Sequence, residues 1–172
     1  MTKHVAFLRA VNVGGTNIIK MYLLRKMFES FGLGNVQTYI QSGNVIFEAR
    51  AAPSLEAKIE KQLEKTLGHK TEVFVRSMEE IERIADQNRF KPGESETLNV
   101  VFLWEESAKS QIETLKQYNS AADEFAVIGR EVYNLLHDRD RSVFSNNFIE
   151  KIFNTATTRN ITTIKKILEK YC

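Results

Sequence analysis

The sequence predicts an α+β protein made of two halves, each running in the order strand, helix, strand, strand, helix. Short apolar segments that favour β-structure alternate with segments whose apolar residues recur every three or four positions. Glycine-containing turns and one Pro-Gly pair separate these segments. The order of elements begins again after the Pro-Gly pair, so the chain repeats an architecture.

The first strand and the first helix are predicted over residues 4–11 and 20–31. Residues 4–11 form a short apolar run, HVAFLRAV, that favours β-structure. The two glycines within residues 12–17 break that pattern. Apolar side chains at helical spacing follow at Met21, Leu24, Met27, Phe28 and Phe31. This spacing is typical of a helix with one buried face, and Gly32 and Gly34 end it, as glycine commonly does.

The rest of the first half is predicted as a hairpin, a second helix and a fourth strand. Residues 36–41 and 45–47 are two strands around a Ser-Gly-Asn turn. The helix opens at Pro53, where the missing backbone donor would be unpaired in any case, and it ends before Gly68. Residues 72–75 complete a ferredoxin-like half, which is a four-stranded antiparallel sheet with two helices on one face.

The second half repeats this order after a connecting helix at residues 77–88. We place the boundary beside the Pro-Gly pair, which gives a first half of residues 1–90 and a second half of residues 91–172. Strands and helices of the second half are predicted at 98–104, 107–118, 124–128, 131–136 and 142–153. Residues 161–171 carry the apolar stripe of a helix. The second ferredoxin-like half is therefore predicted to lack its last strand and to end in a helix.

Composition restricts the classes of function. A net charge of +2, from 24 basic and 22 acidic residues, disfavours a strongly basic nucleic-acid surface. No apolar run reaches the length of a membrane-spanning helix, and the first residues lack a signal-peptide pattern. The single cysteine, Cys172, and three scattered histidines provide no metal-ligand spacing, so we predict no metal or cofactor. We expect a cytoplasmic protein, and the sequence leaves its oligomeric state open.

Chain topology predicts that two polar loops of the first half meet. A right-handed strand–helix–strand crossover makes the first two strands parallel, so residues 12–17 and 42–44 lie at the same end of the sheet. Glycines there allow a ligand to approach the backbone, and the amides that begin the helix favour an anion. The residues predicted to bind a small phosphate- or carboxylate-bearing ligand are Arg9, Asn12, Gly14, Gly15, Asn17, Lys20, Gln41, Ser42, Gly43 and Asn44.

Other interpretations of the same residues stay open. The glycine turns also serve simply to reverse the chain, and Arg9 also suits a surface ion pair. The spacing matches neither a dinucleotide fingerprint nor a phosphate loop, and no acid–base pair or activated nucleophile is evident, so enzymatic activity is left open. A protein–protein interaction or oligomerisation module is the main alternative. RNA binding ranks last, because Phe7, Tyr39 and Phe47 lack the basic and aromatic consensus around them.

Two clusters of residues resemble a known family. Residues 7–13 (FLRAVNV) with the following glycine pair, and residues 38–47 (TYIQSGNVIF), look like the signature of domain-of-unknown-function family 1697. Residues 131–133 (EVY) and 157–160 (TTRN), with Lys165, are similar to the family's second cluster. The resemblance covers essentially the whole chain. It implies two ferredoxin-like halves and no established reaction.

The second cluster adds three candidate residues to the anion site. Thr158, Arg159 and Asn160 precede a predicted helix, so a Thr or Asn among them also suits a helix cap. Arg159 and Lys165 instead offer charges that complete an anion pocket. One departure from the family affects this region, because residues 138–141 read DRDR where family members tend to carry glycines.

Overall fold

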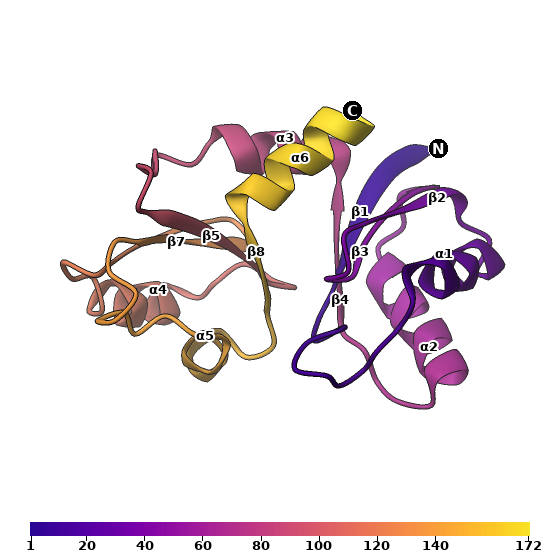
Figure 1. Ribbon diagram of the computed structural model, residues 1–172, viewed down its shortest axis with the longest axis horizontal. Coiled ribbons are helices and arrows are strands. Elements are labelled where there is room, and N and C mark those ends of the chain that lie inside the picture. The colour runs from indigo at the N-terminus through magenta and orange to yellow at the C-terminus, as the bar shows by residue number, and fades with distance from the viewer. The chain divides into compact units, whose positions relative to one another are not determined.

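A computed structural model describes residues 1–172 and contains two four-stranded antiparallel sheets (Figure 1). The chain forms two compact units. The first comprises Met1–Glu82 together with Ile167–Cys172, and the second comprises Arg83–Lys166. The predicted boundary at residues 90 and 91 lies in the connection between the helix α3 (Met78–Asp86) and the strand β5 (Thr97–Phe102). The assignment of residues 1–90 and 91–172 to two halves stays a prediction.

The first unit has the strand order β2-β3-β1-β4. Its elements are β1 (Thr2–Leu8), α1 (Met21–Ser30), β2 (Gly34–Tyr39), β3 (Asn44–Ala49), α2 (Leu55–Leu67) and β4 (Val73–Ser77). The central strand β1 pairs antiparallel with both β3 and β4. Since β2 is antiparallel to β3, β1 and β2 are parallel, as the predicted crossover requires.

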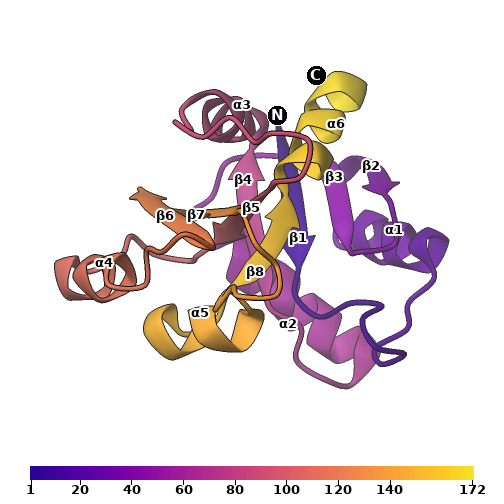
Figure 2. The ribbon, with the colours of Figure 1, turned by 60° about the vertical axis from the view of Figure 1, so that its left-hand side comes forward.

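Helices α1 and α2 cover one face of this sheet (Figure 2). Alternate strand residues such as Leu8 and Phe47 point towards the helices and pack with Leu24, Phe28 and Leu63 in one core cluster. The rings of Phe28 and Phe47 lie 5.9 Å apart. Burial of each such side chain stabilises the folded state by roughly 1.5–3 kcal/mol. The apolar stripe of α1 is the face that gains this stabilisation, so its spacing in the sequence indicated the helix.

The second unit repeats the arrangement with the strand order β6-β7-β5-β8. After β5, its elements are α4 (Lys109–Lys116), β6 (Asp123–Ile128), β7 (Glu131–Leu136), α5 (Asn146–Phe153), β8 (Thr157–Asn160) and α6 (Ile161–Tyr171). Helices α4 and α5 lie on one face of the sheet (Figure 1). Leu115, Ile149 and Phe153 of these helices share a core with Val101 and Val132 of the strands.

The prediction that the second half lacks its last strand is wrong. Strand β8 pairs antiparallel with β5, from Asn99 opposite Asn160 to Phe102 opposite Thr157. The strand has only four residues, and all of them are polar, so no apolar alternation marks it. Helix α6 begins at Ile161, directly after this strand. Because Thr and Asn commonly cap helices, residues 157–160 were interpreted as the cap of α6. The chain does end in this helix, as predicted.

The end of α6 groups with the first sheet. Tyr171 Oη donates a hydrogen bond to Thr38 O at 3.3 Å, and its ring meets the ring of Tyr39 edge to face at 6.3 Å.

None of the helices in the chain combines the length and apolar character that a membrane span needs.

Candidate functional site

The two polar loops of the first unit touch at one end of its sheet. Asn12 Nδ2 donates to Gln41 O at 2.8 Å and to Ile19 O at 3.0 Å, while Ile19 N donates to Asn12 Oδ1 at 2.7 Å. Leu8 N also donates to Gly43 O at 2.9 Å. The loop between β1 and α1 extends beyond the end of β1 in Figure 2. We call residues 9–23 and 40–44 the rim.

A tight turn forms the tip of the rim. Thr16 N donates to Val13 O at 3.1 Å, which closes a turn whose central residues, Gly14 and Gly15, have φ angles of 60° and 74°. Two successive positive φ angles are the requirement of a type I′ turn, in which glycine avoids the steric penalty that other residues meet. The glycine pair therefore has a purely conformational explanation, although its open surface leaves room for a binding partner.

The space between the two loops is filled by apolar side chains. A Cβ atom on Gly43 would stand 3.1 Å from Leu8 Cβ and 3.2 Å from Val11 Cβ, and both of these residues are buried. Gly43 is thus needed for close packing as well as for its φ of 76°. This packing leaves little room for a ligand to enter between the loops at Gly43.

Several side chains predicted to bind an anion make contacts within the first unit. The fully buried Asn44 donates to Tyr39 O at 2.9 Å and to Ser42 Oγ at 3.0 Å. Asn17 Nδ2 donates to Ala10 O at 3.3 Å. Arg9 forms an ion pair with Glu72 at 3.4 Å. Their role in ligand binding stays a prediction, while their role in shaping the rim follows from these contacts.

Besides Asn17, two of the side chains predicted in the rim are exposed. Gln41 binds Asn12 through its backbone oxygen, and its side chain is exposed. Lys20 is exposed at the N-terminal end of α1, where no side chain caps the helix amides. Lys20 is therefore the predicted residue best placed to meet an anionic group.

The second predicted cluster lies in β8 of the second unit. Arg159 is buried, and its Nη1 donates to Thr157 Oγ1 at 2.9 Å and to Thr158 O at 2.8 Å. Burial lowers the pKa of the Arg159 guanidinium to about 10, so the side chain is still charged at neutral pH. Asn160 Oδ1 accepts from Thr162 N at 2.8 Å and caps α6. The role of these residues in ligand binding stays a prediction.

The rim also exposes apolar side chains, which were not predicted from the sequence. Of nine large apolar side chains exposed in the whole chain, five lie there: Val13, Ile18, Tyr22, Leu23 and Ile40. Ile18 is 74% exposed and Val13 is 59% exposed. The Asn12 side chain bonds to Ile19 and Gln41. Val13, Ile18 and Ile40 are the chain neighbours of these three bonded residues, so the hydrogen bonds help to hold them in place. The sequence held a signal, since Tyr22 and Leu23 are apolar yet lie off the buried stripe of α1.

The rim and the rest of α1 together carry an excess of basic side chains. Between residues 9 and 31 the chain carries four basic side chains and one acidic side chain. The acidic residue, Glu29, lies 3.6 Å from Arg25. Lys26 Nζ lies over the Tyr22 ring at 5.9 Å from its centre, which places a cation beside one of the exposed apolar groups.

Comparison with known proteins assigns the chain to a family. A family model described as "Protein of unknown function (DUF1697)" matches residues 1–133. The chain belongs to the DUF1697 family. A conserved bacterial protein from Streptococcus pneumoniae has a structure similar to that of this DUF1697 protein, with a TM-score of 0.77 and 22% identity over 98% of this chain and 97% of the other. That likeness shows the shared fold. No curated protein matches the chain.

In this DUF1697 protein, the two segments of the first half that carry the family resemblance are neighbours. Residues 7–13 and 38–47 are joined by the bond from Asn12 to Gln41 and by the bond from Leu8 to Gly43. Asn12 has a φ of 56°, a conformation that asparagine adopts more readily than most residues. The resembling residues thus include those that set the shape of the rim.

Proposed function

We propose that the protein is an interaction module whose rim binds an acidic, partly apolar segment of another polypeptide. The observation that carries this proposal is that five of the nine large exposed apolar side chains belong to the rim, next to the basic residues of α1. Single exposed apolar residues are normal, whereas a cluster with polar surroundings is typical of an interaction site.

Rigidity of the rim supports this function. The three hydrogen bonds of the Asn12 side chain and the tight turn at Gly14 and Gly15 fix the loop before any partner arrives. A loop that is already ordered loses less conformational entropy on binding, so more of the free energy of apolar contact appears as affinity.

Charge determines the kind of partner. Lys20 and Lys26 are exposed, and neither forms an ion pair with a carboxylate. Acidic side chains on a partner complement these lysines and accelerate association, while apolar side chains beside them cover Ile18 and Tyr22. An acidic segment with interspersed apolar residues therefore matches both properties of the rim.

Selection from a phage-displayed library of random peptides tests the proposal. The wild-type protein serves as bait, and enriched peptides are then measured by fluorescence polarisation. We expect enriched peptides to combine acidic and apolar residues, and Ile18→Asp or Lys20→Glu to weaken them by about tenfold, which is about 1.4 kcal/mol. Val143→Asp changes an exposed apolar residue of the second unit and is the matched control, with no expected effect. Peptides that bind all four proteins equally would contradict the proposal.

A small anionic ligand at the rim is a second candidate, favoured by the exposed Lys20 beside uncapped helix amides. Titration of ¹⁵N-labelled protein with inorganic phosphate and with acetate tests it. Shifts of the Gly14, Gly15 and Met21 amides that disappear in Lys20→Ala would support this ligand class. Unchanged spectra would remove it and would leave the peptide proposal intact.

A further inference from the structure

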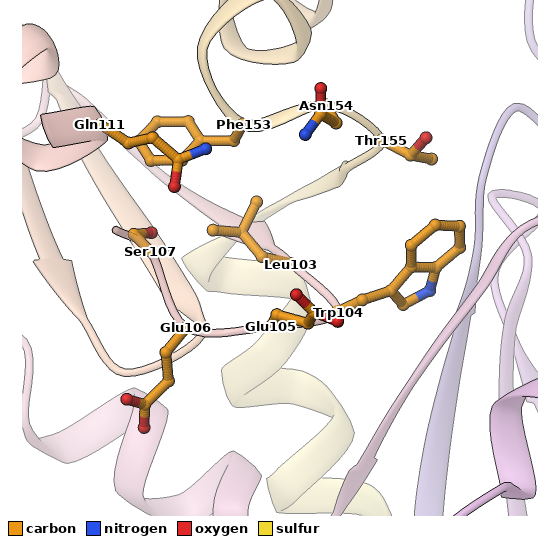
Figure 3. Close-up of a pocket in the computed structure, with 9 residues that line it drawn as sticks. All are labelled: Leu103, Trp104, Glu105, Glu106, Ser107, Gln111, Phe153, Asn154 and Thr155. Carbon is orange, nitrogen blue, oxygen red and sulfur yellow. The ribbon is translucent and has the colours of Figure 1, made fainter. Parts of the chain in front are cut away.

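A cavity of about 270 Å³ lies within the second unit, and no rim residue lines it (Figure 3). Residues 103–107, which lead from β5 to α4, form one wall, and residues 153–155 at the end of α5 form another, with Gln111 between them. The cavity equals about nine water molecules at ~30 Å³ each, which is enough for a ligand of monosaccharide size.

One hydroxyl in this cavity is buried without a partner. Ser107 Oγ is inaccessible to solvent and makes no hydrogen bond, whereas the nearby Gln111 side chain accepts from Ala108 N at 2.8 Å and donates to Ile152 O at 2.9 Å. In Figure 3 the Ser107 hydroxyl points into the gap. A buried polar group without a partner in the chain destabilises the folded protein, so this hydroxyl is a candidate for a bond to a molecule in the cavity.

Backbone strain marks the opposite wall. Asn154 has φ 64° and ψ −142°, a combination that is essentially restricted to glycine. Its side chain lies across the gap from Ser107 in Figure 3. Strain of this kind tends to persist where it positions a functional group.

The cavity lining specifies the charge of its ligand. Glu105 and Glu106 belong to the lining, and no basic side chain does. The Glu106 carboxylate points away from the other residues in Figure 3, which leaves Glu105 as the group beside the cavity. Leu103 and Phe153, both buried, provide an apolar floor.

We propose that this cavity binds a small hydroxylated amine, whose ammonium group pairs with Glu105 and whose hydroxyl bonds with Ser107 Oγ. The inference is independent of the rim, because all of its residues belong to the second unit.

Three sugars of similar size and different charge test the ligand class. Glucosamine, glucose and glucuronate are titrated separately into ¹⁵N-labelled protein. We expect glucosamine to shift the Ser107 and Asn154 amides, glucose to shift them more weakly and glucuronate to leave them unchanged. Glu105→Gln should weaken glucosamine binding severalfold, whereas Glu106→Gln should not. Equal shifts with glucuronate, or no shift with any of the three, would overturn the proposal.

A stability measurement on the protein without added ligand provides an independent check. Ser107→Ala removes an unpaired hydroxyl, so we expect an unchanged or raised Tm. Ser145→Ala is the matched control, because Ser145 Oγ accepts from Phe148 N at 3.1 Å and caps α5, and its loss should lower Tm. A fall in Tm for Ser107→Ala as large as that for Ser145→Ala would show that the Ser107 hydroxyl already has a partner in the chain, and the proposal would fail.

Discussion

Substitution of Gly43 by alanine tests whether the space between the rim loops is filled. Its φ of 76° lies in the left-handed region, which costs a residue with a side chain about 1–2 kcal/mol. The new Cβ would also stand 3.1 Å from Leu8 Cβ and 3.2 Å from Val11 Cβ, closer than ordinary carbon–carbon contact. Both neighbouring atoms are attached directly to the backbone, so rotation of a side chain cannot relieve the contact.

The two effects together give the expected magnitude. Overpacking of a buried site typically costs about 1–3 kcal/mol, so Gly43→Ala should lower the free energy of unfolding by about 2–5 kcal/mol in all. Gly68 is the matched control, because its φ is 78° and no atom lies within 4 Å of the position of its missing Cβ. Gly68→Ala should therefore lose only about 1–2 kcal/mol from backbone strain.

Urea denaturation followed by circular dichroism measures both variants. A larger loss for Gly43→Ala than for Gly68→Ala confirms that Leu8 and Val11 fill the space at Gly43. Equal losses would refute this packing and would restore an open gap between the loops, as the anion-site hypothesis requires.

Two further predictions concern the contacts of single side chains. Asn12→Ala removes three hydrogen bonds and should lower the free energy of unfolding by about 2–4 kcal/mol, measured by urea denaturation; a loss below that of Gly68→Ala would contradict the role of Asn12 in joining the loops. His137 lies 2.6 Å from both Glu124 and Glu96, and these hydrogen bonds raise the pKa of His137. A raised pKa favours the protonated native state, so this stabilisation is complete below the ordinary pKa of about 6.5 and is lost as pH rises through the higher native pKa. His137→Gln should flatten that part of the stability profile, and an unchanged profile would contradict the linkage.

Periodic apolar residues made much of the fold predictable. The apolar stripe of α1, the Pro53 start of α2 and the Ser-Gly-Asn hairpin predicted elements of the first unit, and the crossover rule placed both loops at one end of the sheet. Strand β8 escaped prediction because its four residues are polar and its pairing with β5 depends on distant sequence. The predicted first strand extended too far, because Ala10 adopts a positive φ angle that the run HVAFLRAV does not signal.

The function of the rim was harder to predict than its position. A polar side chain in a loop bonds either to a ligand or to the chain itself, and the sequence does not distinguish these two roles. In the structure, Asn12, Asn17 and Asn44 each donate to a backbone oxygen. Exposure of Ile18 and Val13 likewise depends on how the loop is folded, because the same residues in a buried loop would have joined the core.

The most direct test of the interaction surface is a chemical-shift map of ¹⁵N-labelled protein bound to the most strongly enriched peptide. The proposed function predicts that the largest shifts occur in residues 9–23 and 40–44, and that Lys20→Glu reduces them at the same peptide concentration. Shifts concentrated in β5 to α5 of the second unit, with the rim unchanged, would contradict the assignment of the rim as the binding surface.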